Sequence, residues 1–404
     1  MATGNHGTAR EEEVRSLAAR LGVADFVFVA AQARKGAAQR EASGDGLLIV
    51  GAKGAILQVK SREPLKAQGD SEERARSWVR KTAYKAMGQG LGVKRELARR
   101  QKNGNPLVVA PVRAAHLSPD VRERYAFSIS IDTEAWPVIV IVDHPRMPDI
   151  DLGFVPGAVW LTFQDWLELQ RRLRSTAATI HYVQRALCDL NHVALGHEAE
   201  RYAAMRVADE LAARGSPSEG PYLAHPAYFD DLGTDLFHDV IDKVWPTDGV
   251  IPWRHAEEYR AIVEFLDSVP PNVQSLIGRW FLRKRAEIAS GRRQSSGLVL
   301  LERRDRLVYA CSDARHWEDT HDWQIEITLL AAMRHKQALE TGAPDETATL
   351  CVAALVEERD GQTGVSYSFV MLNGHEADVP IPADLRSSFE RQYGVHNHRA
   401  GETL

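Results

Sequence analysis

Three polar residues in a short, mostly apolar stretch have side chains suited to metal-dependent hydrolysis. They are Asp45, Gln58 and Lys60, in the segments 41–50 and 55–62. Phosphodiester hydrolysis needs a carboxylate that holds a hard divalent cation, further oxygen ligands, and a positive group near the charge developing on phosphorus. Asp45 suits the metal, the amide oxygen of Gln58 can help to bind it, and Lys60 suits the charge. The trio therefore predicts a cutting centre that uses Mg²⁺ or Mn²⁺.

Two strand-like runs, residues 47–51 and 55–61, position these side chains. A turn-forming Ala-Lys-Gly segment separates the runs, which predicts a hairpin. Successive residues of a strand point to opposite faces, so Gln58 and Lys60 project together. An amide and an ammonium buried without partners lose hydration worth about 1–3 kcal/mol. Asp45, at the start of the neighbouring strand, is placed to be their partner.

The elements around the hairpin indicate an α-β-β-β-α-β order. Thr8 and Glu11 form a capping-box pattern that opens a helix ending at Gly22. The other expected elements of this region are a strand at 26–30, a helix from Ser71 towards Gly88, a buried strand at 106–110, further strands at 126–131 and 137–142, and a helix from 163 to about 174.

With this motif and this element order, residues 9–115 resemble the restriction-endonuclease-like superfamily, and in particular its Mrr-like branch. There a glutamine replaces the acidic residue of the usual motif, an aspartate followed by Asp or Glu-x-Lys. The resemblance implies that Asp45 matches the metal-binding aspartate, Gln58 the variant glutamine and Lys60 the catalytic lysine. It also implies a metal-dependent deoxyribonuclease, of a kind used in restriction or phage defence.

The family has a further glutamate in its first helix, and two residues here are candidates for this second carboxylate. Glu13 flanks the apolar face of the first helix, whereas Glu12 points away from that face and Glu11 belongs to the cap. Glu41 is the rival, because the entry into the strand can bring it alongside the cation held by Asp45. We expect Glu13 or Glu41 to complete the metal site, and prefer Glu13.

The charge of the chain is unevenly distributed. The net charge is -5, yet residues 1–110 contain 20 Lys and Arg against 11 Asp and Glu, and the remainder 30 against 44. A polyanion is therefore expected to meet the amino-terminal region. The residues expected to bind DNA are Arg62, Lys66, Arg74, Lys81 and Lys85. The alternative is that they form an ordinary solvated surface.

A length of 404 residues predicts two or three domains. We expect residues 1–175 to form an α/β nuclease-like domain with a mixed sheet flanked by helices. Residues 176–290 are expected to be mostly helical, and residues 291–404 to form a small α+β domain of unknown role. Residues 176–404 are expected to supply target recognition or assembly, through a homo-oligomer or a protein partner. The competing hypothesis is an inactive nuclease-fold module that binds nucleic acid or acts as a scaffold.

The sequence also indicates where the protein resides. No segment approaches the roughly 20 apolar residues of a membrane span, and the first residues lack the features of a secretory signal. We therefore expect a cytoplasmic protein without membrane association. The three cysteines are widely separated, which favours buried, reduced thiols over a disulfide framework or a zinc cluster.

Overall fold

A computed structural model places most of the chain. It describes residues 6–28, 45–114, 117, 125, 127–129, 132–188, 194–215, 231–245, 256–290, 294–300, 305–316, 320–344, 347–359, 362–373 and 397–399. The chain divides into two compact units, Met1–Glu210 with Gly249–Ala256 and Leu211–Asp248 with Glu257–Leu404. The expected boundary at 175 falls inside the first unit. No helix among the described ranges is long and apolar enough to cross a membrane.

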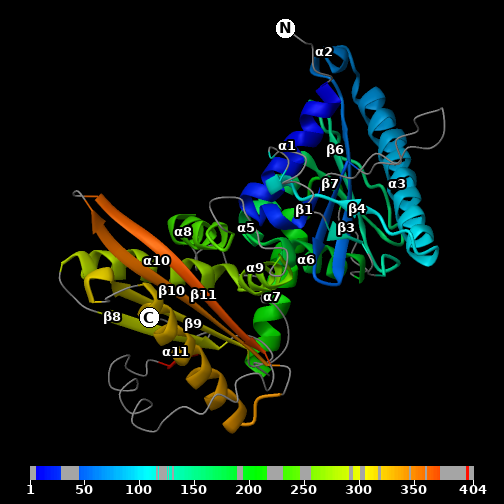
Figure 1. Ribbon diagram of the computed structural model, residues 1–404. Helices are drawn as coiled ribbons and strands as arrows, with labels where there is room; N and C mark the ends of the chain where they lie inside the picture. Colours follow the sequence, from blue (N-terminus) through cyan, green and yellow to red (C-terminus); the bar gives the residue numbers. More distant parts are fainter. Residues whose placement is uncertain are drawn as a thin grey trace. The chain divides into compact units, whose positions relative to one another are not determined.

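The first unit is a mixed sheet flanked by helices (Figure 1). Its elements are α1 (His6–Leu21), η1 (Ala24–Phe26), β1 (Val27–Phe28), β2 (Gly46–Val50), β3 (Lys53–Ser61), α2 (Pro64–Ala67), α3 (Glu72–Lys102), β4 (Val108–Val109), η2 (Val112–Ala114), β5 (Phe127–Ser128), β6 (Val138–Asp143), β7 (Ala158–Thr162), α5 (Phe163–Leu173), α6 (Thr176–Cys188) and most of α7 (Glu198–Gly215), whose residues from Leu211 on are assigned to the second unit. The main sheet has the order β1-β2-β3-β6-β7. β1, β2 and β3 form an antiparallel meander, and β6 and β7 add to it in parallel.

The predicted hairpin is confirmed, since β2 pairs antiparallel with β3 in a register that places Gly46 opposite Leu57. The expected helix at Ser71 is also confirmed, because the Ser71 side chain accepts a hydrogen bond from the Arg74 backbone N–H at 3.3 Å. It extends beyond Gly88 to Lys102. The first helix begins at His6, so Thr8 lies inside it and the predicted capping box is wrong.

The strand expected at 106–110 does not join the main sheet. Only Val108 and Val109 are extended, and they pair with β5 in a separate two-stranded sheet. The parallel neighbour of β3 is instead β6, whose residues Val138 to Val142 are all buried. A strand covered on both faces needs apolar residues throughout, which this run has, whereas Val108 is 55% exposed.

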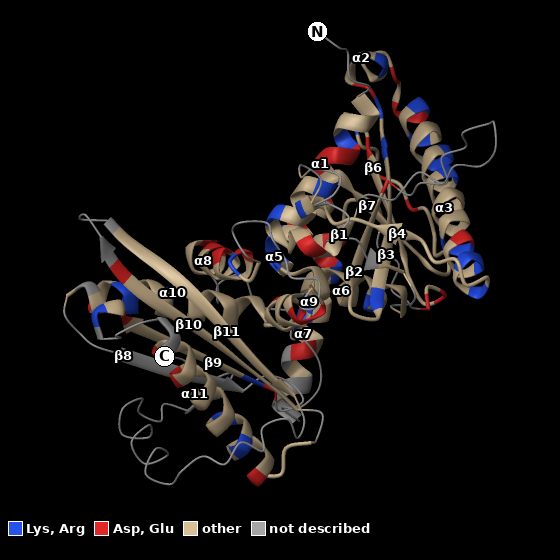
Figure 2. Cartoon of the chain, viewed as in Figure 1, with Lys and Arg blue, Asp and Glu red and all other residues tan. Residues whose placement is uncertain are grey.

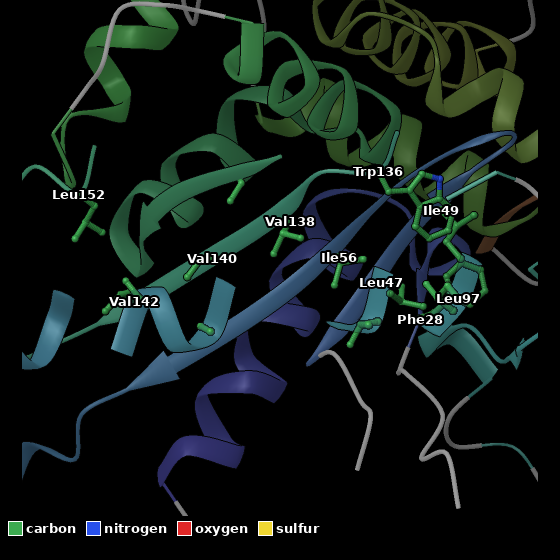
Figure 3. Packing of buried hydrophobic residues seen from close by; sticks show 14 of the residues in the cluster. Phe28, Leu47, Ile49, Ile56, Leu97, Trp136, Val138, Val140, Val142 and Leu152 are labelled. Atoms are coloured by element: carbon green, nitrogen blue, oxygen red, sulfur yellow. The ribbon is translucent and has the colours of Figure 1, made fainter. Parts of the chain in front are cut away.

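Helix α3 covers one face of the main sheet. Its buried side chains, among them Val79, Ala83 and Ala86, pack against Ile56 and Val138 in an extended apolar cluster. Figure 3 shows part of this cluster along β3 and β6. Burial of this apolar surface contributes most of the stability of the layer, at about 25 cal/mol per Å².

Helices α1 and α5 lie on the opposite face. The indole N–H of Trp166 in α5 donates to the Val14 carbonyl of α1 at 3.3 Å. Helix α5 begins as predicted, and Thr162 and Asp165 form a full capping box at its first turn. Because α1 and α3 cover opposite faces, the ends of β3 are the only parts of that strand from which polar side chains reach solvent within the described residues.

The second unit contains α8 (Asp231–Asp242), α9 (Ala256–Asp267), α10 (Pro271–Ala289), β8 (Gln294–Leu300), β9 (Arg306–Asp313), η6 (Ala314–His316), α11 (Thr320–Glu340), β10 (Ala348–Arg359), β11 (Gln362–Asn373) and β12 (Asn397–Arg399). Its sheet has the order β11-β10-β9-β8-β12, in which β9 and β10 are parallel. Trp323 of α11 packs on one side of β9, and Trp280 of α10 stacks edge-on against Tyr309 of β9. Residues 291–404 therefore contain both strands and helix, as expected for an α+β region.

Candidate functional site

Asp45 is the residue directly before β2, and the neighbouring strand β3 extends beyond the point where β2 begins. Its backbone N–H donates to the Leu57 carbonyl at 3.0 Å, which extends the hairpin ladder by one residue. Its carboxylate Oδ2 accepts the Val59 backbone N–H at 2.5 Å. The side chain therefore takes the place that a further residue of β2 would occupy beside β3. This arrangement holds the carboxylate in the plane of the sheet, beside the end of β3.

Lys60 reaches back to this carboxylate. Its ammonium lies 3.2 Å from Asp45 Oδ2 and donates to the Val59 carbonyl at 2.9 Å. Both side chains are largely buried, so their ion pair is less screened than a surface pair. The ammonium thus lies between two oxygen atoms, one from a carboxylate and one from the backbone.

Gln58 belongs to the same group through the backbone. Its side chain is almost fully buried, at 1% exposure, and its amide nitrogen donates to the Leu57 carbonyl at 3.1 Å. The same carbonyl accepts the Asp45 N–H. The Gln58 side chain also lies against α3, where a β-carbon at Gly90 would come within 3.2 Å of its Cγ. The structure therefore brings Asp45, Gln58 and Lys60 together.

Arg15 is a member of this group that the sequence analysis did not identify. It extends from α1, and its guanidinium donates to the Asp45 carbonyl. A β-carbon at Gly46 would lie 3.2 Å from Arg15 Cγ, so the glycine leaves room for this side chain. Gly46 was the one sequence feature that could have indicated a side chain packed against the backbone here, but a glycine beside a strand most often indicates a turn or bulge.

The two candidates for a second carboxylate have different positions. Glu13 is 51% exposed, and its carboxylate pairs with Arg10 at 2.6 Å, one turn earlier in α1. Glu41 lies outside the described residues. Glu13 is therefore paired within its own helix, but a surface ion pair of this kind costs little to break, so Glu13 and Glu41 both remain candidates for the second carboxylate.

A second polar network lies where the parallel strands β3 and β6 end. The Ser61 hydroxyl donates to Asp143 Oδ2 at 2.9 Å and lies 3.0 Å from His6 Nε2. The Asp143 carboxylate also pairs with Arg10 at 2.9 Å. Ser61 and Asp143 are register partners, because both lie at carboxyl ends of parallel strands. The strand expected at 137–142 had no assigned partner, so this pair was not identified from the sequence.

Arg62, expected to bind DNA, is turned towards the protein. Its guanidinium lies 3.2 Å from Asp70 Oδ2 and 5.6 Å from the ring centroid of Trp78. His144 Nε2 lies 3.4 Å from the same Asp70 oxygen, and its ring is 5.4 Å from that of Trp78. These contacts tie the segment after β3 to the start of α3 and to the residue after β6. In this arrangement Arg62 stabilises the fold.

The other basic residues expected to bind DNA are on the surface. Lys66 pairs with Glu63 at 2.5 Å, and this hydrogen bond lowers the pKa of the Glu63 carboxyl. Arg74, Lys81 and Lys85 are exposed along α3. Surface ion pairs contribute little to stability, so Lys66 can leave Glu63 at small cost.

The donor set at Asp45 fits Mg²⁺ in part. This ion takes oxygen ligands, accepts one or two carboxylates, and keeps several of its waters. Asp45 Oδ2 and the Val59 carbonyl supply two oxygens that already surround a positive charge. Within the described ranges, no group of three or more His, Cys, Asp or Glu side chains is placed to hold a metal.

The chain was compared with protein families, curated proteins and solved structures. No family model matches the chain, and no curated protein and no solved structure matches it either.

Proposed function

We propose that the protein is a metal-dependent deoxyribonuclease of restriction-endonuclease-like type, and that Asp45, Gln58 and Lys60 form its cutting centre. The observation that supports this proposal is the position of the Lys60 ammonium between Asp45 Oδ2 and the Val59 carbonyl. A divalent ion bound by the same two oxygens would displace the ammonium, and the flexible lysine side chain would keep it beside the ion. The ammonium is therefore suited to stabilise negative charge on a phosphate that approaches the ion.

Each residue has a distinct part in this proposal. The Asp45 carboxylate and the Val59 carbonyl would hold Mg²⁺ or Mn²⁺, and this ion would supply activation of a water molecule and polarisation of the phosphate. Lys60 stabilises the charge that develops on the phosphate oxygens. Arg15 keeps Asp45 in place by donating to the Asp45 carbonyl, and Gln58 donates to the Leu57 carbonyl that also accepts the Asp45 N–H. Glu13 and Glu41 remain the candidates for the second carboxylate, and a role in restriction or phage defence would follow from DNA cleavage.

The test is cleavage of supercoiled plasmid by the purified full-length protein with Mg²⁺ or Mn²⁺. We expect the plasmid to be nicked or linearised, and a chelator to stop the reaction. Lys60→Ala should lower the rate by about 10²- to 10³-fold, the usual cost of losing one group that stabilises charge in the transition state. Lys53→Ala is the matched control, because this exposed lysine lies at the opposite end of the same strand. If both Lys60→Ala and Asp45→Ala still cleave the plasmid, the assignment of the site is wrong.

A second candidate function is nucleic-acid binding without cutting. The observation that favours it is that no group of three or more His, Cys, Asp or Glu side chains is placed to hold a metal within the described residues. In that case the plasmid stays intact with either metal, and a mobility-shift titration still detects a complex that weakens steeply as salt rises. A protein that neither cuts nor shifts DNA would be left with a scaffolding role.

A further inference from the structure

Helix α3 has a basic outward face. At about 100° per residue, Arg74, Lys81, Lys85 and Arg95 lie within one narrow stripe on the side opposite the buried residues. All four are exposed, and no Asp or Glu of the helix falls within the stripe between them. Figure 2 shows Lys and Arg recurring along α3. Such a face is complementary to a polyanion.

Three glycines interrupt this helix, and the fold explains only one. A β-carbon at Gly90 would lie 2.3 Å from Val138 Cγ1, so close packing on β6 requires glycine there. A β-carbon at Gly88 or Gly92 would meet nothing within 4 Å. Glycine is, after proline, the residue least favourable to a helix interior. Gly88 and Gly92 therefore weaken the helix without serving its internal packing.

The two unexplained glycines lie inside the basic stripe. They follow Lys81 and Lys85 and precede Arg95, at the same angular position on the helix. Without side chains at 88 and 92, the helix has a shallow gap with cations at both ends. Glycine serves in this way where a ligand must come close to the backbone.

The basic face ends before the end of the helix. Arg99 is held by Glu96 in two hydrogen bonds, at 2.7 and 2.9 Å. Asp132 and Glu134 line the same surface hollow as Arg99 and Lys102. Acidic groups at that end disfavour a polyanion, which limits the contact surface to the part of α3 between Arg74 and Arg95.

We propose that α3 between Arg74 and Arg95 binds one sugar-phosphate ridge of duplex DNA, and that this ridge enters the gap at Gly88 and Gly92. The segment is about 32 Å long at 1.5 Å per residue, close to one turn of B-DNA. Charge excludes the other evident occupant, a second copy of the same helix, because pairing two such faces would bring like charges together. The inference rests on the proposed function and adds the surface that positions its substrate.

The test measures binding of a fluorescent DNA duplex to the full chain without divalent metal, so that cleavage does not interfere. Gly88→Leu with Gly92→Leu should weaken binding by about tenfold, because the ridge is held away from the backbone. Gln89→Leu is the matched control, since it places the same leucine on the same turn but outside the stripe, where a side chain is already present. Gly88→Ala with Gly92→Ala should raise the thermal midpoint of unfolding and still weaken binding. A gain in stability excludes misfolding as the cause of that loss.

The charges are tested by salt dependence. Lys81→Ala and Lys85→Ala should each lower the slope of log Kd against log salt by about 0.9, the value for one phosphate contact. Arg80→Ala, an exposed neighbour outside the stripe, should leave the slope unchanged.

Unchanged affinity in both glycine double variants would overturn this inference. So would tighter binding of duplex RNA than of DNA, or a dimer that Gly88→Leu with Gly92→Leu dissociates. Failure of this inference can be told apart from failure of the proposed function. If Lys60→Ala abolishes cleavage while the glycine variants bind DNA normally, the proposed function stands and only the α3 surface is wrong.

Discussion

The ammonium of Lys60 lies 3.2 Å from the carboxylate of Asp45, although 15 positions separate the two residues in the chain. The hairpin creates this proximity, because β2 starts one residue after Asp45 and β3 continues beside it. The same geometry gives Asp45 a second partner, the backbone N–H of Val59. A single carboxylate thus completes the end of a strand and binds the only ammonium at this site among the described residues.

Replacing Asp45 should separate its structural role from its charge. Asp45→Asn keeps an oxygen for the Val59 N–H, whereas Asp45→Ala leaves that donor and the Lys60 ammonium without their acceptor. We expect Asp45→Ala to lower the free energy of unfolding by about 1–3 kcal/mol and Asp45→Asn to lower it by less. Urea unfolding followed by circular dichroism measures both. Equal losses would mean that the hydrogen bond to Val59 contributes nothing.

Gly90 should tolerate no side chain. Gly90→Ala would place its β-carbon 2.3 Å from Val138 Cγ1 and force α3 away from β6. We expect a loss of about 1–3 kcal/mol in the free energy of unfolding, as for other overpacked cores. Gly88→Ala, two residues earlier and facing open space, should gain up to about 1 kcal/mol. Opposite shifts of the thermal midpoint in these two variants are the expected result, and shifts of the same sign would contradict it.

Glu96 should contribute to stability only above acidic pH. Hydrogen bonds from Arg99, and secondarily from Arg100, lower the pKa of its carboxyl from 4.5 to about 2 in the folded protein. A lowered folded pKa adds stability above the unfolded value and loses it as pH falls towards the folded one. Glu96→Gln should therefore cost about 0.2–1 kcal/mol near neutral pH, because this pair is close to the surface. That difference should shrink between pH 4.5 and about 2 in thermal unfolding scans. A constant difference across this range would rule out the ion pair as its source.

The three cysteines should differ in reactivity. Burial raises the pKa of both Cys311 and Cys351 to about 12, whereas Cys188 is exposed at the end of α6. Because the thiolate is the reactive form, a thiol reagent should label Cys188 rapidly in the folded protein. The two buried thiols should react only after denaturation. Cys188→Ser should abolish the rapid phase, and a rapid phase that persists in this variant would show that a buried thiol is accessible. The expectation that all three thiols are buried is wrong for Cys188.

The local elements followed directly from the sequence because they depend on neighbouring residues. Alternation along 55–61 and the turn before it were sufficient to place Gln58 and Lys60 beside Asp45. The cap at Ser71 and the helix at Phe163 were equally local. The three-residue grouping depends only on this hairpin, so no long-range contact was needed to predict it.

Tertiary structure decided which strand lies on the other side of β3. Residues 106–110 and 138–142 are both apolar, and only packing against α3 and α1 selects the second run for the sheet. That choice places Asp143 beside Ser61 and His144 beside Asp70. The tertiary fold also pairs Arg62 with Asp70 and brings Arg15 from α1 onto Asp45. The sequence thus determined a short hairpin with its polar side chains, because their spacing is local. The fold decided which distant side chains surround them, since those contacts arise only when the helices cover the sheet.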